Sequence, residues 1–271
     1  MNTSKIVIIS LINILFLSTV SYPHDSWLVP DTYRMKPGET VTISANTGMD
    51  FPKSLNAIST DRIDRFFIVG MSGTIRLGNF EVAGNSTRAT CIPGKPGTYT
   101  AALALMPKLI KLAPEEFNRY LLSDGMKNIY ELRKREGTLN EYAIESYSKY
   151  PKTILQVGDK TDDSCLKPVN LPVEIVPESN PYTLNKGDKL VVTALFMGEP
   201  LAGWELSWSY PGHGESFAGT VITGKDGRAA VPLEKSGPTV LRFTHMMKVN
   251  KKTHNWESHW ASLTFDVADN R

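Results

Sequence analysis

Cysteine and net charge are both scarce in this 271-residue chain, which has only Cys91 and Cys165 and a formal charge of +2. Neither cysteine has the close partner that a zinc site requires, so the thiols predict no structural metal. In an oxidising compartment they could form a disulfide, and two separate thiols fit the sequence equally well. The near-neutral charge, which falls by one if Lys5 is removed, gives no electrostatic basis for binding nucleic acid.

Enzyme motifs are absent as well. The chain contains no G-x-S-x-G, no H-E-x-x-H, no phosphate-binding loop and no dinucleotide fingerprint. The segments GHG at 212–214 and GKDG at 224–227 are typical of turns. The carboxylates are scattered, so no two of them are marked as an acid and base pair. We therefore do not expect an enzyme.

The chain has one long apolar run, at residues 6–17, and it is too short to span a membrane. Because Lys5 precedes it, the run predicts a secretory signal peptide over residues 1–23, cut after position 21 or 23. Pro23 disfavours a cut before His24. No second run of membrane length follows, so we expect a soluble periplasmic protein without a membrane span.

Turn-then-strand segments dominate the rest of the chain and predict a mainly β fold. Strands are expected at residues 24–30, 62–69 and 73–77, and residues 94–105 are expected to form a turn followed by a strand. LNKGDKLVVTA is similar to MKPGETVTISA, and EKSGPTVLRFTHM is similar to GKPGTYTAALALM, which indicates two related modules. We therefore expect two immunoglobulin-like β-sandwich domains with a helical insertion in the first.

The helical insertion is predicted at about residues 114–150. Pro114 begins a segment with acids in its first turn and basic residues in its last, and Ser-Asp-Gly at 123–125 divides it into two helices. A third helix is expected at residues 141–150. The four prolines between positions 165 and 181 mark the boundary between a first domain, 24–170, and a second, 171–271.

Histidine is rare and unevenly placed: the chain has five, with none between positions 25 and 212. Residues 239–247 and 257–267 both alternate at period two, and a hairpin centred on Lys252 sets His245 directly opposite His259. Glu257 shares the face of His259, while His254 and His213 lie in predicted loops. Imidazoles with a carboxylate suit Ni, Co, Cu and Zn, so the pattern predicts a transition-metal site.

Other interpretations of these residues are open. A single histidine at a strand end is more often a hydrogen-bonded core residue. Trp27, Trp256 and Trp260 could pack in the core or form a platform for sugars, and packing is the commoner role. A free amino group at His24 would be needed for a copper-dependent oxidative enzyme.

Six segments carry a family resemblance: HDSWLVP, FPKSLNAISTDRIDRFFIVG, LAPEEFNRYLLSDGMKNIYELRKREG, MGEPLAG, TGKDGRAAVPLEKSGPTVLRFTHM and WESHWASLTFDV. In order, they resemble a family of bacterial exported proteins, the domain of unknown function 4198, which is often described as a periplasmic component associated with cobalt or nickel uptake. The resemblance implies that His24 and His245 contact a divalent metal. The chain departs from the pattern at His259, where Tyr is expected, and at Pro23, where a small residue is expected.

We therefore expect a periplasmic protein that binds nickel or cobalt, with copper and zinc as alternatives, and buffers the ion or delivers it to an inner-membrane transporter. The candidate ligands are His24, His213, His245, His254, Glu257 and His259. Because neutral imidazole is required, binding should weaken below about pH 6. The alternative is a non-catalytic carbohydrate- or protein-binding module that uses Trp256 and Trp260.

Overall fold

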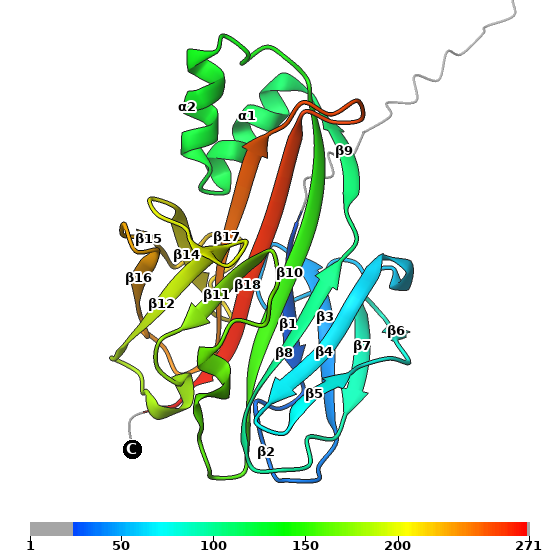
Figure 1. The fold of residues 1–271 in the computed structure, drawn as a ribbon, viewed down its shortest axis with the longest axis vertical. Helices are drawn as coiled ribbons and strands as arrows, with labels where there is room; N and C mark the ends of the chain where they lie inside the picture. The colour runs from blue at the N-terminus through cyan, green and yellow to red at the C-terminus, as the bar shows by residue number, and fades with distance from the viewer. Residues whose placement is uncertain (1–23, 270–271) are drawn as a thin grey trace, which may run out of the picture.

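The fold has three layers of β-sheet, and the longest sheet is the middle layer (Figure 1). The computed structural model describes residues 24–269, so the predicted signal peptide at 1–23 lies outside the described residues. The predicted mainly β class is confirmed.

The middle sheet contains ten strands and runs through both halves of the chain. Residues 145–153 of β10 pair in parallel with residues 256–264 of β18, which joins the two halves into one sheet. The strand order is β15 (Gly219–Ile222), β14 (Glu205–Ser209), β17 (Gly237–Lys248), β18 (Trp256–Val267), β10 (Ala143–Val157), β8 (Gly97–Leu105), β4 (Ile63–Gly70) and β5 (Gly73–Arg76), with β2 (Arg34–Met35) and β9 (Lys108–Leu112) also paired to β10.

Two smaller sheets cover opposite faces of the middle sheet. The first has the order β1 (Asp25–Pro30), β3 (Val41–Gly48), β7 (Ser86–Cys91) and β6 (Glu81–Ala83). The second contains β11 (Val173–Pro177), β12 (Lys189–Phe196), β13 (Glu199–Pro200) and β16 (Arg228–Pro232). Alternation along the strands directs one set of side chains to each face. On β8, for example, Ala101 and Leu103 pack in the core under the first small sheet, and Ala102 and Ala104 in the core under the second.

The two halves repeat one arrangement of strands. The order β1–β3–β7 in the first half corresponds to β11–β12–β16 in the second half. The order β5–β4–β8–β10 in the first half corresponds to β15–β14–β17–β18 in the second half. The similar sequence segments lead into β3 and β12, and become β8 and β17. The matching strand order supports the two related modules that the sequence indicated.

Two helices lie between β9 and β10 and pack on one face of the middle sheet near the β17–β18 loop (Figure 1). Helix α1 (Pro114–Ser123) begins where the Glu116 carboxylate accepts a hydrogen bond from the Ala113 amide. Gly125, with a φ of 76°, follows its end, and α2 (Lys127–Arg135) comes next. The predicted division at residues 123–125 is therefore confirmed.

The third predicted helix, at residues 141–150, is wrong, because this segment begins the 15-residue strand β10. Its side chains alternate between two faces: Tyr147 packs in the core under the helices, and Tyr150 in the core under the second small sheet. Both faces are covered, and the buried positions include the polar side chains of Glu145, Ser148 and Lys149, so the segment lacks the apolar pattern by which a central strand is usually predicted. The helical insertion therefore ends at Arg135.

Cys91 and Cys165 are free thiols in separate cores, so the structure contains no disulfide between them. Burial raises the pKa of Cys91 to about 11 and that of Cys165 to about 12. Both are therefore protonated and unreactive at neutral pH. In residues 24–269, neither helix is long and apolar enough to cross a membrane.

Candidate functional site

His245 of β17 and His259 of β18 are directly opposed in the hairpin that these strands form. The strands pair antiparallel from 237↔267 to 248↔256, so the loop spans residues 249–255 around the predicted centre, Lys252. A register shift of one residue would have moved one ring to the other face. The predicted cross-strand histidine pair is therefore confirmed.

Aromatic side chains surround the pair and hold the rings in place. Phe196, at the end of β12, stacks on His245 with ring centroids 3.9 Å apart and lies 5.8 Å from His259. Trp204 packs against His245 at 4.7 Å, and Tyr150 stacks on His259 at 6.0 Å. The indole of Trp204 is itself fixed, because its Nε1 donates a hydrogen bond to the Thr244 carbonyl at 2.7 Å.

Both imidazoles are kept neutral by this environment. Burial, together with the neighbouring His259, lowers the pKa of His245 to about 4, and burial also lowers the pKa of His259. The Nδ1 atoms of both rings are buried without a hydrogen-bond partner. A buried polar nitrogen without a partner costs free energy, so each ring retains an unused donor or acceptor.

The pair has a ligand chemistry that transition-metal ions accept. Directly opposed residues in an antiparallel sheet have Cβ atoms about 4.5–5.5 Å apart. Neutral imidazole nitrogen binds Zn²⁺ at about 2.0–2.1 Å, and Ni, Co and Cu also accept it. The unpaired nitrogens and the fixed rings therefore fit a two-imidazole ligand set.

His254 and Glu257 form a separate group in and beside the loop. The Glu257 carboxylate accepts hydrogen bonds from His254 Nε2 at 2.9 Å and from the Lys251 ammonium at 2.5 Å. These hydrogen bonds lower the pKa of Glu257. The Nδ1 of His254 contacts the Thr253 hydroxyl at 2.8 Å, so both ring nitrogens are engaged.

The structure does not bring His213 or His24 to the histidine pair. His213 lies in the loop before β15, where its Nδ1 is 3.0 Å from the Ser216 carbonyl and its ring packs edge-on against Tyr210. The carbonyl of His24 accepts a hydrogen bond from Lys149, which faces Trp260 on the other side of the middle sheet. Between positions 24 and 269, no three His, Cys, Asp or Glu side chains are grouped to hold a metal ion.

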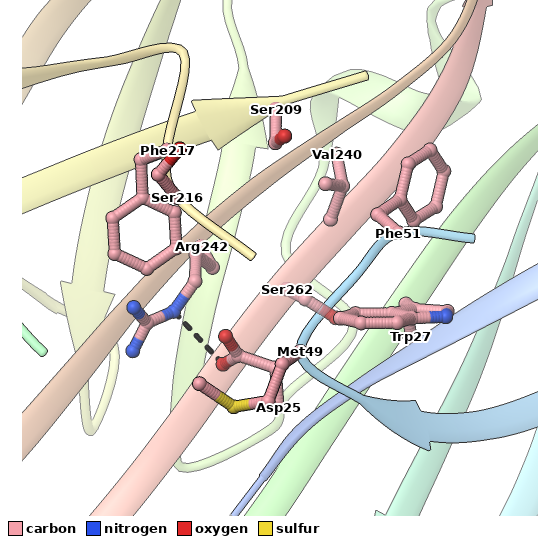
Figure 2. A pocket seen from close by; sticks show the side chains of 10 residues that line it. All are labelled: Asp25, Trp27, Met49, Phe51, Ser209, Ser216, Phe217, Val240, Arg242 and Ser262. Carbon is pink, nitrogen blue, oxygen red and sulfur yellow. Dashed lines mark ion pairs between the residues drawn. The ribbon is translucent and has the colours of Figure 1, made fainter. Parts of the chain in front are cut away.

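A cluster of buried charges on that opposite face was not predicted from the sequence. Arg242 of β17, with 4% of its side chain exposed, lies 2.8 Å from the Asp25 carboxylate and 3.7 Å from that of Asp124. Its guanidinium also stacks on Phe217 at 4.7 Å. Figure 2 shows the Asp25–Arg242 ion pair in a crevice between Phe217 and Ser216 on one side and Trp27 and Phe51 on the other.

Glu145 and Lys149 of β10 extend the cluster under helix α1. Glu145 accepts hydrogen bonds from the Tyr120 hydroxyl at 3.1 Å and from the Ser258 hydroxyl. Burial raises the pKa of Glu145 to about 7 and that of Asp124 to about 7, and lowers the pKa of Lys149 to about 8. The cluster therefore holds ionisable groups whose protonation changes near neutral pH.

One sequence signal could have indicated this cluster. The face of the hairpin opposite the histidine pair carries Arg242, Thr244, Ser258, Ser262 and Thr264, which resembles a solvated face. In the structure β1 covers it: the hydroxyls of Ser262 and Thr264 donate hydrogen bonds at 2.6 Å to backbone carbonyls of β1. Small hydroxyl side chains on a central hairpin can thus mark a covered face.

The tryptophans proposed as a sugar platform are core residues. Trp27, Trp256 and Trp260 are 3%, 1% and 3% exposed. Trp256 packs on Phe117, and Trp260 stacks on Tyr120 beneath the helices. None of the three presents the open ring face that stacking on a sugar requires, so the structure does not support that alternative.

The comparisons with known proteins identify a family and no function. The family model described as "Domain of unknown function (DUF4198)" matches residues 21–247. No curated protein matches the chain.

Several solved structures match this chain with low TM-scores. They include the D0-D1 domain of intimin (10% identity, 89% of this chain and 97% of that chain, TM-score 0.20). Trypsin-activated alpha-2-macroglobulin from Escherichia coli is 13% identical to this chain, and the match covers 92% of this chain and 16% of that chain with a TM-score of 0.24. The mouse nectin-like molecule 4 ectodomain is 12% identical to this chain, and the match covers 91% of this chain and 65% of that chain with a TM-score of 0.21. TM-scores this low carry no argument about function.

Proposed function

This chain belongs to the family described as a domain of unknown function (DUF4198), and we propose that it is an exported protein that binds a transition-metal ion, nickel or cobalt in the first place, through His245 and His259. In this proposal the ion is a cargo rather than a catalytic cofactor. The protein buffers it in the periplasm or passes it to an inner-membrane uptake transporter.

The observation that carries the proposal is the histidine pair itself. Two directly opposed imidazoles, His245 buried and His259 half-buried, are neutral at pH 7, fixed by aromatic rings and left with buried, unpartnered Nδ1 atoms. A purely structural histidine in a core is normally satisfied by a hydrogen bond. Two adjacent unsatisfied rings are better explained by a ligand that both can bind.

A set of two protein ligands suits transfer better than storage. Sites that retain their metal usually close a four-ligand shell, whereas sites that exchange a ligand keep positions open. Within the described part of the chain the pair supplies two nitrogens, so solvent or a second protein would complete the coordination. An acceptor transporter could then bind the ion before the two imidazoles release it.

The pair does not by itself select nickel or cobalt. Imidazole nitrogen binds copper more tightly than nickel or cobalt, so the choice of cargo in the cell depends on which ion is available. Copper and zinc therefore belong in every titration. The pH at which binding is lost should also be lower than the value of about 6 expected from the sequence, because the neutral form of His245 persists down to about pH 4.

Export is supported by the N-terminal sequence. Lys5 and the apolar run at residues 6–17 precede the family match, which begins at residue 21. The family resemblance also points to the periplasm. A nickel or cobalt cargo in that compartment would need an inner-membrane transporter as the next partner.

The test is a competition titration with Ni²⁺, Co²⁺, Cu²⁺ and Zn²⁺ of the mature chain from which a chelator has removed all metal. We expect one equivalent to bind the wild-type chain. The variant His259→Tyr keeps an aromatic ring at this position and removes the imidazole, so it should weaken binding at least about tenfold, and His245→Gln with His259→Tyr should abolish it. Circular dichroism and urea unfolding confirm that each variant is folded.

The matched controls are His254→Gln and His213→Gln, which remove imidazoles outside the pair and should leave the affinity unchanged. The proposal fails if the folded double variant binds as tightly as wild type. It also fails if either control variant loses the bound ion, because the ligands would then lie elsewhere.

A further inference from the structure

A second concave site lies on the opposite face of the middle sheet and is lined by residues of β1, β9 and β10. Its volume is about 220 Å³, which is several times the roughly 30 Å³ that one water occupies in the liquid. The pocket is thus large enough for a small organic molecule.

The charged side chains of this pocket are all basic. Arg62, Lys108 and Lys149 line it, together with His24, and no aspartate or glutamate of residues 24–269 is among its lining side chains. The nearest buried carboxylates already have partners: Asp25 pairs with Arg242, and Glu145 accepts from Tyr120 and Ser258. The pocket therefore presents positive charge that its own walls do not neutralise.

Arg62 has an unused donor in this pocket. Its Nη2 donates to the Met106 carbonyl at 2.7 Å, and its guanidinium stacks on the Tyr147 ring with 5.2 Å from Cζ to the ring centroid. Its Nε is buried and has no hydrogen-bond partner. These contacts fix the guanidinium plane and leave the Nε N–H for a ligand, and a planar guanidinium favours carboxylate.

Lys149 is a buried cation near the carboxylates of Asp25, Asp124 and Glu145, and it forms a direct ion pair with none of them. It is 4% exposed, and its ammonium group donates to the neutral carbonyl of His24 and lies over the rings of Tyr147 and Trp260. Within residues 24–269 it makes no ion pair. An ammonium group has three donors, so further acceptors can bind it.

The remaining walls favour an organic anion over a mineral one. The hydroxyls of Ser26 and Thr47 line one part of the pocket, and the apolar side chains of Ile58, Leu105 and Ile110 line another. A fully hydrated inorganic ion gains nothing from apolar walls, whereas methylene groups do. The exposed Lys108 provides a third cation, apart from the half-buried Arg62 and the buried Lys149.

We propose that this pocket binds a small organic dicarboxylate. One carboxylate contacts Lys149 and Arg62, the methylene chain lies against Ile58, Leu105 and Ile110, and the second carboxylate contacts Lys108. This site is on the other face of the sheet from His245 and His259 and does not depend on metal binding. The variant that lacks both histidines should keep it.

The test is isothermal titration calorimetry of the metal-free mature chain with three probes at constant ionic strength: glutarate, butyrate and inorganic phosphate. We expect saturable binding of glutarate at one site, weaker binding of butyrate and the weakest of phosphate. Arg62→Gln should weaken glutarate and butyrate at least about tenfold, because both use the inner carboxylate position. Lys108→Gln should weaken glutarate alone.

Lys111→Gln is the matched control, since Lys111 is an exposed lysine of the same strand β9 outside the pocket and should not change any affinity. The proposal is overturned if the folded wild-type chain shows no saturable glutarate binding, or if phosphate binds most tightly. It is also overturned if Lys111→Gln weakens binding as much as Lys108→Gln, which would mean general surface attraction.

Discussion

His245 and Glu145 lie on opposite faces of the middle sheet, and each is buried with an atom that lacks a hydrogen-bond partner. Burial favours the neutral form of both side chains, because surroundings of low polarity disfavour a charge. It lowers the pKa of His245 to about 4 and raises that of Glu145 to about 7. The neutral imidazole is ready to bind a cation, while the carboxyl group is ready to take up a proton.

At the residue scale, Glu145→Gln should remove part of the pH dependence of stability. The pKa of Glu145 is raised from 4.5 to about 7 in the folded state, so between these values the folded chain holds a proton that the unfolded chain has lost. The unfolding free energy therefore falls as the pH rises from about 4.5 to 7, by on the order of 3 kcal/mol. Urea unfolding of the variant across this range should lack that fall.

The difference in unfolding free energy between wild type and variant isolates the contribution of Glu145. His245 contributes in the opposite direction, because its stabilisation is lost as the pH falls from 6.5 toward 4, but this contribution is the same in both chains. Glu81→Gln, on the exposed strand β6, is the control and should follow the wild-type curve. Equal slopes for wild type and Glu145→Gln would contradict the account.

At the scale of elements, the helix pair and the β17–β18 hairpin depend on each other. Helix α1 inserts Phe117 and Tyr120 against Trp256 and Trp260, which come from the face of the hairpin opposite the histidine pair. Arg133 of α2, 1% exposed, closes this core, with its guanidinium 4.8 Å from the Phe117 ring centroid. The helices thus support one face of the hairpin while the other carries the histidines.

Phe117→Ala should destabilise the protein by about 3–5 kcal/mol, because it leaves a cavity beneath a fully buried ring. Leu122→Ala on the same helix is the control: Leu122 is 51% exposed, and its truncation should change stability by less than about 0.5 kcal/mol. Urea unfolding followed by tryptophan fluorescence measures both. Similar losses in the two variants would show that the helix is weakened in general rather than through its packed face.

The hairpin could be predicted from the sequence, and β10 could not. Position 252 is midway between His245 and His259, and two alternating segments flank it, so local spacing was enough to set the register. Residues 143–150 have no comparable local signal. Their strand form depends on pairing with β18, which is more than 100 residues away along the chain.

At the scale of the whole molecule, one sheet separates two sites of different chemistry. The histidine pair faces the second small sheet, and the basic pocket and the charge cluster face the first small sheet and the helices. The hydroxyl side chains of the hairpin mark the covered face, but the members of the cluster, at positions 25, 124, 145, 149 and 242, could not be identified from the sequence because they come together only when β1 crosses the parallel β10–β18 junction. The sequence predicted the pair, whereas the fold alone created the cluster.

The most direct test of metal binding at the pair is a nitrogen-15 spectrum of the imidazole groups during titration with Zn²⁺. The chain has five histidines, so each ring can be assigned by single substitution. We predict that the signals of His245 and His259 shift together and saturate at one equivalent, while those of His24, His213 and His254 do not move. Shifts of the latter three with His245 and His259 unchanged would contradict the account.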